Sequence, residues 1–190
     1  MRKVQVVGPD HRLRLAEIGE LSALAYLADG LLDSSDPYIP SLRDAKARAE
    51  QAILLVAASG ANGEGAAVGT ITVVPPHTPF SEFDGDDFEL RMLAVSPLVR
   101  EQGVGEDLAR AGIEKAVERG ATRILLSTME NMTAAHKLYE KLGFVRLPEL
   151  DWMAHPGATK VRCDVACLQP DGTCVDGGHR LLAYAWVPAK

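Results

Sequence analysis

The sequence predicts a single α/β (α+β) domain, because segments with strand character alternate with segments of helical periodicity along the chain. Hydrophobic residues make up 47% and charged residues 24% of its 190 residues, which are ordinary proportions for a globular protein and argue against disorder or a coiled coil. A chain of this length buries a substantial core. We therefore expect one domain over residues 1–190, in which helices flank a central sheet.

Charge and cysteine content narrow the function classes. The formal net charge is −6 and there is no long lysine or arginine run, so we expect neither a nucleic-acid partner nor a membrane partner. The sequence shows no apolar stretch long enough to span a bilayer and no signal-peptide pattern at its start. The three cysteines are an odd number, so we expect reduced thiols and a cytoplasmic location.

In the first half of the chain, apolar spacing and turn residues predict three strands and two helices. The first helix is expected to end near Gly30, and Ser41 is expected to cap the second. Residues 75–87 are rich in proline and acidic residues, so we expect a mobile surface loop. In order, the predicted elements are a strand over 3–7, a helix over 12–32, a helix over 41–51, and a hairpin of strands over 52–58 and 66–74.

The most informative segment is the turn from Val99 to Gly105, which lies between an apolar strand over 88–95 and a helix over 104–117. The first amides of a helix have no partner inside it, and the aligned peptide dipoles place partial positive charge at that end. Gly103 and Gly105 lack side chains, so a diphosphate can approach the backbone, and Arg100 adds a cation. The segment therefore predicts a phosphate-binding turn.

The second half of the chain contains another motif with helical periodicity. Met132, Ala135 and Leu138 share one helical face with Tyr139 and Leu142. A glycine follows this helix directly and is typical of a helix end. After the helix that ends before Gly120, the predicted elements are a strand over 123–127, a helix over 131–142, a strand over 144–146 and a last strand over 181–186.

Together these motifs resemble the GNAT superfamily of acyl-CoA-dependent N-acetyltransferases. That family has an Arg/Gln-x-x-Gly-x-Gly/Ala turn after its fourth strand and an Ala-x-x-Leu-Tyr-x-x-Leu-Gly-Phe helix end. The matching residues are Leu93-Ala94-Val95-Ser96-Pro97, Arg100, Gly103 and Gly105, then Ala135, Leu138, Tyr139, Leu142, Gly143 and Phe144. The resemblance covers residues 1–150 in element order and implies a GNAT-like central mixed, mostly antiparallel sheet flanked by helices.

The resemblance implies acetyl-CoA as co-substrate and no metal. In the family, the amides of the turn hold the pyrophosphate, and the fourth strand pairs through its backbone with the pantetheine arm. Asn131 is a further cofactor contact in this reading, or alternatively a helix cap. The implied cofactor-binding residues are Leu93, Ala94, Val95, Arg100, Gln102, Gly103, Val104, Gly105, Glu106 and Asn131.

The resemblance also implies two catalytic residues. An amine attacks a thioester only when it is neutral, and a carboxylate can take its proton directly or through water. A glutamate early in the fourth strand has this role in some members, here Glu89, and the helix tyrosine commonly protonates the departing thiolate, here Tyr139. From the residues alone, Glu89 is also explained as a strand-edge charge paired with Arg91, and Tyr139 as a packed aromatic side chain. Asp33 and Asp36 either supply an alternative base or shape a turn.

Three features depart from the family pattern. Glu101 stands where many members have glycine, and a carboxylate there repels a pyrophosphate unless it points to solvent. Met132 stands where many members have asparagine. Residues 154–180 replace a short hairpin, and we expect them to form an extra C-terminal β-hairpin before the last strand, turning at Asp171-Gly172. This segment holds Cys163, Cys167, Cys174 and His179, whose spacing lacks a Cys-x-x-Cys pair and does not favour zinc.

We therefore expect an N-acetyltransferase that moves an acetyl group from acetyl-CoA to a primary amine by direct attack in a ternary complex. No cysteine falls in the motif region to carry an acetyl intermediate. The acceptor is a small-molecule amine or a peptide amine, and the protein is a monomer or homodimer. The alternative is a catalytically silent acyl-CoA sensor or docking module. A Rossmann-type nucleotide site is disfavoured because the full Gly-x-Gly-x-x-Gly pattern is missing.

Overall fold

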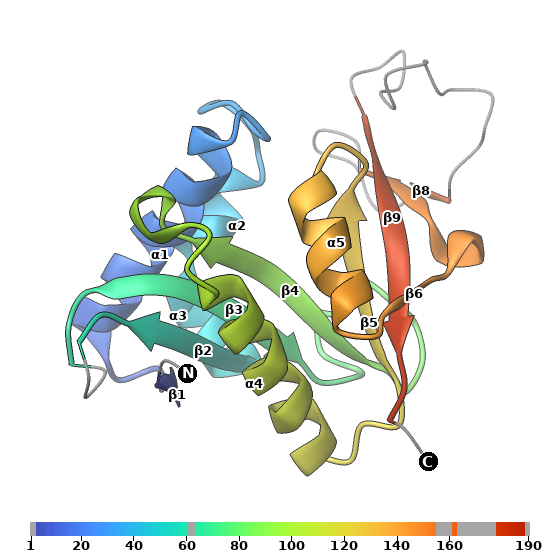
Figure 1. The fold of residues 1–190 in the computed structure, drawn as a ribbon, viewed down its shortest axis with the longest axis horizontal. Coiled ribbons are helices and arrows are strands. Elements are labelled where there is room, and N and C mark those ends of the chain that lie inside the picture. Colours follow the sequence, from blue (N-terminus) through green and yellow to red (C-terminus); the bar gives the residue numbers. More distant parts are fainter. Residues whose placement is uncertain (1–2, 61–63, 155–160, 163–177, 189–190) are drawn as a thin grey trace. The chain divides into compact units, whose positions relative to one another are not determined.

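The computed structural model describes residues 3–60, 64–154, 161–162 and 178–188. For residues 161–162 only the backbone is described. The chain divides into two compact units, Met1–Ala121 and Thr122–Lys190. In Figure 1 the first unit runs from blue to yellow-green and the second from yellow to red. None of the helices in the described ranges is both long and apolar enough to cross a membrane. The expected single domain over 1–190 stays a prediction.

An antiparallel sheet forms the centre of the first unit. Its strands pair in chain order and are β1 (Val4–Val6), β2 (Ile53–Ala58), β3 (Ala67–Val74) and β4 (Phe88–Val95). The helices of this unit are α1 (Arg12–Ala28), α2 (Ile39–Arg43), α3 (Ala45–Gln51) and α4 (Val104–Glu118), with a 3-10 turn, η1, over Pro97–Val99. Strand β2 is buried along its whole length, because helices cover both faces of the sheet.

The two faces of this sheet carry different helices (Figure 1). On one face, α1 and α3 pack through Leu15, Ile18 and Ala45 against Leu54 and Val56 of β2. On the other face, α4 packs against β3 and β4, and the interface includes two glycines, Gly69 and Gly112, where an added Cβ would stand 3.0 Å or less from a neighbouring side chain. The alternation of side chains along a strand therefore sends neighbouring residues of β4 to different helices.

A β-bulge interrupts the pairing of β4 with β3. Thr70 pairs with Ala94 and Thr72 pairs with Arg91, so two β4 residues lie opposite Ile71. One of them, Met92, has a φ of 53°, in the left-handed region that L-residues rarely adopt. A bulge bends the strand and re-aims the side chains that follow it. Here the bend lies at the start of residues 93–95, which the family resemblance implies to pair with pantetheine.

The second unit is built around the long strand β9. In the order β5-β9-β7-β8 the strands are β5 (Ile124–Met129), β9 (His179–Trp186), β7 (Trp152–Ala154) and β8 (Val161–Arg162), and β6 (Val145–Arg146) pairs with the far half of β9. Every pairing described within the two units is antiparallel. Helix α5 (Thr133–Lys141) contacts β9 through its aromatic side chains.

The predicted helices and strands occur in the predicted order, with differences at helix starts. The helix expected over 41–51 is two helices, because Asp44 has non-helical backbone angles and its Oδ1 caps α3 by accepting from the Ala47 amide at 2.9 Å. Ser41 lies inside α2 and caps neither. The N-cap of α5 is Met132 rather than Asn131, without a side-chain cap.

The expected hairpin over 154–180 is described only in part. Residues 161–162 form β8 and pair with β7, whereas the three cysteines and the Asp171-Gly172 turn lie outside the described residues. The expectations about this segment therefore stay predictions.

Candidate active site

The segment between β4 and α4 is a turn that leads into the N-terminus of a long helix. Ser96 ends the strand, with its amide bonded to Val68 O at 2.9 Å, and caps η1 through its hydroxyl. Gly103 is the N-cap of α4, and the first helical hydrogen bond runs from the Asp107 amide to Gly103 O at 2.9 Å. The amides of Val104 and Gly105 therefore precede the hydrogen-bond ladder of the helix and point out of its N-terminus.

Two residues of this turn have left-handed backbone angles. Gly103 has a φ of 79°, and no atom of the described residues lies within 4 Å of the position that a Cβ would take. Glu101 has a φ of 60° and an exposed side chain. Because the Glu101 carboxylate is exposed to solvent, it repels a pyrophosphate in the turn less than a buried carboxylate would. The backbone angle explains why a glycine suits this position better.

Arg100, the cation predicted at this turn, already has an acidic partner. Its Nη1 lies 2.5 Å from Oδ1 of Asp29, the C-cap residue of α1, and both side chains are about two-fifths exposed. The guanidinium is thus held beside the turn, but part of its charge is neutralised. A diphosphate would compete with Asp29 for it.

Gly69 allows the N-terminus of α4 to lie close to the sheet. A Cβ at Gly69 would stand 2.7 Å from Leu108 Cδ1 and 2.9 Å from Val104 Cγ1, closer than real Cβ contacts occur. Val104 is the first residue of α4 and is fully buried. Because Gly69 of β3 has no side chain, the first turns of α4, and with them the predicted anion site, lie close to the sheet. An isolated glycine inside a strand is a sequence signal for such an approach.

Glu89, the predicted base, is a buried carboxylate that binds the preceding loop. Its side chain is 1% exposed. Oε1 accepts from the Phe83 amide at 3.0 Å and from the Ser81 hydroxyl, and the Glu82 amide donates to Oε1 at 2.9 Å and to Oε2 at 3.0 Å. Oε1 accepts three of these hydrogen bonds and Oε2 accepts one, so Oε2 can accept a hydrogen bond from a further donor.

Arg91 completes the attachment of this loop to β4. It donates to Phe80 O and pairs with Glu82, and its guanidinium lies 5.7 Å from the centre of the Phe80 ring. The alternative pairing of Glu89 with Arg91 is therefore wrong, because Glu82 takes that place. The loop over 75–87 is also less solvated than expected, since Phe83 is buried.

Asp33 and Asp36 shape the turn between α1 and α2, which is the second of the two roles considered for them. Oδ1 of Asp33 accepts from the Ser35 amide at 2.7 Å and from its hydroxyl at 2.5 Å. These bonds from Ser35 lower the pKa of Asp33 below its usual value. Oδ1 of Asp36 accepts from the Tyr38 amide at 2.8 Å.

Tyr139, the predicted acid, lies in the second unit on the buried face of α5. Its ring packs against Phe144 at 5.7 Å and Tyr184 at 6.4 Å between ring centres, and the residue is 7% exposed. Burial raises the pKa of Tyr139 above its ordinary value. The hydroxyl therefore stays protonated at neutral pH and remains able to donate a proton or a hydrogen bond.

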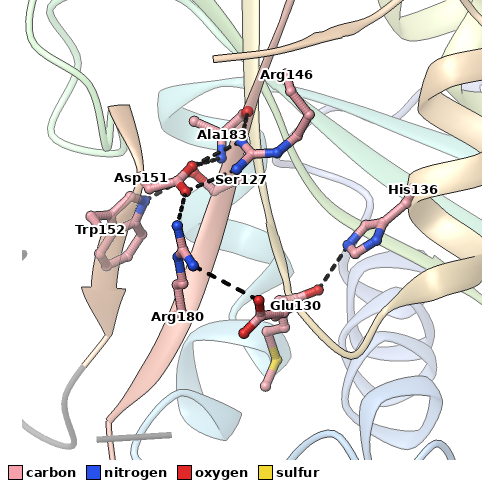
Figure 2. Close-up of polar contacts among 9 residues, drawn as sticks. Ser127, Glu130, His136, Arg146, Asp151, Trp152, Arg180 and Ala183 are labelled. Atoms are coloured by element: carbon pink, nitrogen blue, oxygen red, sulfur yellow. Dashed lines mark hydrogen bonds and ion pairs between the residues drawn. The ribbon is translucent and has the colours of Figure 1, made fainter. Parts of the chain in front are cut away.

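A buried ionic network centred on Asp151 fixes strand β9 (Figure 2). Asp151 accepts from Arg146 through both oxygens, at 2.8 and 2.9 Å, from Arg180 at 2.9 Å and from the Ala183 amide at 2.9 Å. Burial alone would raise the pKa of Asp151, but these hydrogen bonds and the charge of Arg146 lower it. The Arg146 guanidinium lies 5.2 Å from the centre of the Tyr184 ring, so the network also holds the ring against which Tyr139 packs.

The predicted residues thus fall into two groups. The described structure brings the turn residues of the first unit together at the N-terminus of α4, with residues 93–95 of β4 leading into it. Tyr139 and Asn131 belong to the second unit, where Asn131 is exposed next to the start of α5. Sequence reasoning missed the bulge at Met92, for which a methionine gives no signal, and the close packing at Gly69.

Comparisons with known proteins agree with this description. The profile of the acetyltransferase (GNAT) family matches residues 19–144. Over 80 residues the chain is 38% identical to the N-acetylaspartate synthetase of Danio rerio, covering 42% of this chain and 28% of the relative. Over 58 residues it is 40% identical to the mycothiol acetyltransferase of Streptosporangium roseum, covering 30% and 17%. The matched regions thus span less than a third of these relatives.

Solved structures confirm the fold. The acetyltransferase yncA of Salmonella typhimurium, solved with acetyl-CoA, superposes with a TM-score of 0.62 at 16% identity, over 100% of this chain and 95% of that one. At this identity the likeness establishes the α/β, GNAT-like fold and nothing further. The family match covers well over half of the sequence. The chain therefore belongs to the GNAT acetyltransferase family.

Proposed function

We propose that this protein transfers the acetyl group of acetyl-CoA to a primary amine. The observation that carries the proposal is the turn before α4, where Gly103 leaves open space at a helix N-terminus that follows a bulged strand. A side chain at Gly103 would fill that space, so the turn fits a diphosphate. The residues that would hold the cofactor are the turn amides of 102–106 with Arg100, the backbone of Leu93, Ala94 and Val95, and Asn131.

The acid and the base have separate tasks in this proposal. The neutral amine nitrogen attacks the thioester carbonyl carbon, the carbon–sulfur bond breaks, and Tyr139 donates its proton to the departing sulfur. The proton lost by the amine passes to a water or to Glu89. Because Glu89 is 1% exposed and Oε2 is the less occupied oxygen, a water beside Oε2 is the direct acceptor of that proton.

The acceptor is a small-molecule amine or a peptide amine, and the protein acts as a monomer or homodimer. Relatives with matched segments bear names that include N-acetylaspartate synthetase and mycothiol acetyltransferase. These names support amine acceptors of low molecular mass for this chain as well. A cytoplasmic location, where acetyl-CoA is made and used, completes the proposal.

A second candidate is an acyl-CoA sensor without turnover. The observations in its favour are the carboxylate of Glu101 in the turn and the pairing of Arg100 with Asp29, both of which weaken an anion site. The two candidates differ in turnover. An enzyme releases free CoA thiol when acetyl-CoA and an amine panel are supplied, whereas a sensor binds acetyl-CoA and releases none.

The decisive experiment compares Tyr139→Phe with Tyr184→Phe. Both variants keep the aromatic packing of the cluster and remove one hydroxyl. We expect Tyr139→Phe to lower kcat about 100-fold, the lower limit for loss of a general acid, with the Kd for acetyl-CoA unchanged by calorimetry. Tyr184→Phe should keep the parent rate. Equal rates in the parent and Tyr139→Phe would remove Tyr139 from the mechanism.

A further inference from the structure

Arg48 is a fully buried arginine with unused hydrogen-bond donors. It lies in α3, and its side chain reaches between α1 and α2, where Nη2 donates to Ser22 Oγ at 3.0 Å and to Leu42 O at 2.9 Å. Among the described residues, Nε and Nη1 have no hydrogen-bond partner. Buried polar groups are almost always hydrogen-bonded, so two unused donors on one guanidinium call for an explanation.

The charge of Arg48 also lacks a direct partner in the described part of the chain. Burial lowers the pKa of Arg48 to about 10, and the guanidinium therefore stays charged at neutral pH. The charge of Asp44 acts against this lowering, but its Oδ1 accepts from the Ala47 amide and caps α3. A buried charge is normally compensated by an ion of opposite sign. Arg48 therefore has no counter-ion among the described residues.

Arg48 is part of a polar and aromatic cluster on one face of β4. Tyr38 lies close enough to Arg91 and Arg48 to be influenced by the charges of both guanidinium groups. Tyr26 packs edge-on against Tyr38 at 6.4 Å, and Met92 of the bulge belongs to the same cluster as Tyr38. Arg91 is paired with Glu82, whereas Arg48 is the guanidinium of this cluster that has no ion pair among the described residues.

The cluster lies beside the strand that the proposed function assigns to the acetyl donor. Arg91 shares a face of the sheet with Thr72, the face covered by α1 and α3, and residues 93–95 follow directly. Tyr38 is half-buried and lies close enough to Arg48 to be influenced by its charge. Because Arg48 is 0% exposed, a ligand reaches its unused donors only if a neighbouring side chain changes rotamer.

We infer that Arg48 binds a carboxylate of the acceptor, so that the substrate class is amino acids and related amines that carry a carboxylate. This inference rests on the proposed acetyl transfer. The carboxylate would accept from the two donors that are now unused, and charge-assisted hydrogen bonds of this kind are the strong ones. The amine would then lie toward Glu89, the proposed base, which shares this face of β4 with Arg91.

The kinetic test uses pairs of acceptors that differ only in the carboxylate. Each of a panel of amino acids is compared with its amide by the release of CoA thiol. We expect the parent to prefer the carboxylate form about 10- to 100-fold in kcat/KM. Arg48→Met keeps the side-chain volume and should reduce this preference to near unity, whereas Arg43→Met, the same change at an exposed arginine of α2, should keep it. An equal preference in Arg48→Met overturns the inference.

A binding test decides the inference even if no amine is turned over. The Arg48 Nε–H signal in ¹⁵N NMR is assigned by its loss in Arg48→Met, or by its loss in Arg48→Lys if the methionine variant does not fold. Titration with amino acids should shift that signal, and titration with their amides or with inorganic phosphate should not. A signal unmoved by every amino acid means that Arg48 holds buried water and overturns the inference. Absence of thiol release with all amines refutes the proposed function separately.

Discussion

Glu101 illustrates how one residue can weaken a site that its neighbours build. Its φ of 60° places a side chain where the backbone favours glycine, and its carboxylate stands in the turn proposed to bind a pyrophosphate. The first effect costs stability, on the order of 1 kcal/mol for a non-glycine residue in the left-handed region. The second opposes the anion directly, although the exposure of the side chain limits it through solvent screening.

We therefore predict that Glu101→Gly tightens acetyl-CoA binding severalfold, as measured by calorimetry, and raises the Tm. His77→Gly is the matched control, because His77 also has a φ of 60° and an exposed side chain, but lies in the loop before β4. It should raise the Tm comparably and leave the Kd for acetyl-CoA unchanged. Equal binding by the parent and Glu101→Gly would show that this carboxylate does not meet the ligand.

At the scale of elements, the contact between β3 and α4 links the sheet to the turn. In Gly69→Ala the new methyl group would stand 2.7 Å from Leu108 and 2.9 Å from Val104, so the first turn of α4 must move away. Overpacking of this kind costs about 1–3 kcal/mol. We predict that Gly69→Ala lowers both the free energy of unfolding and the affinity for acetyl-CoA.

Gly112→Ala provides the comparison for this prediction. Gly112 lies further along the same helix, and its Cβ would stand 3.0 Å from Leu90 Cδ2, the end of a flexible side chain. Denaturant unfolding should show a smaller loss of stability than in Gly69→Ala. Acetyl-CoA titration should show the parent affinity, since the start of α4 stays in place. A loss of affinity that is equal in both variants would mean that the height of the turn above β3 is unimportant.

In the second unit, the ionisation of Asp151 makes the stability of the fold depend on pH. Hydrogen bonds from Arg146, Arg180 and Ala183 outweigh the effect of burial and lower the pKa of Asp151 below its unfolded value. A lowered pKa stabilises the folded state above the unfolded pKa, and this contribution is lost as pH falls through the folded pKa. Stability should therefore drop below about pH 4.

Asp151→Asn should lower the free energy of unfolding by about 3–5 kcal/mol at neutral pH, because Arg146 and Arg180 both lose the negative charge with which they pair. The variant should also lose part of the acid dependence, which urea unfolding at pH 3 to 7 measures. Asp86→Asn is the control, since that side chain is 97% exposed and pairs only with exposed His77 among the described contacts. An acid dependence that is unchanged in Asp151→Asn would place the titrating group elsewhere.

At the scale of the whole molecule, the sequence was most informative where local signals suffice. The turn was predictable because strand, glycine and helix signals follow one another within a few residues, and Gly103 takes the left-handed angle that glycine favours. The break between α2 and α3 was missed because Asp44 looks like an ordinary polar residue within a helical pattern. Only its backbone angles show it as a cap.

Features that depend on contacts distant in the sequence were not predictable. Arg48 fits a helical pattern in which charged residues face solvent, yet helices α1 and α2 bury it completely. Glu89 was expected to be a catalytic base or a strand-edge charge, and its bonds to residues 81–83 depend on how a loop folds back. Loops of this length carry no pattern from which such contacts can be read.

The prediction of a single domain has its own test, because the two tryptophans and the glycine turn belong to different units. Trp152 and Trp186 lie in the second unit, and Gly103 lies in the first. A ligand that binds only the folded state raises stability by about 2.7 kcal/mol at 100 times its Kd, which is about 5–10 °C in Tm for a chain of this size. If the chain unfolds as one cooperative domain, acetyl-CoA raises the Tm reported by tryptophan fluorescence by this amount.

Gly103→Asp should abolish this shift by placing a carboxylate in the turn. Gly120→Asp is its control, since Gly120 also has a positive φ and open space around it among the described residues, but lies beyond the other end of α4. Both variants strain the backbone, so both should lower the Tm of the free protein, whereas only Gly103→Asp should lose the response to acetyl-CoA. A parent Tm that rises by circular dichroism but not by tryptophan fluorescence would mean that the units unfold separately and that acetyl-CoA is bound mainly by the first unit, which contains the turn.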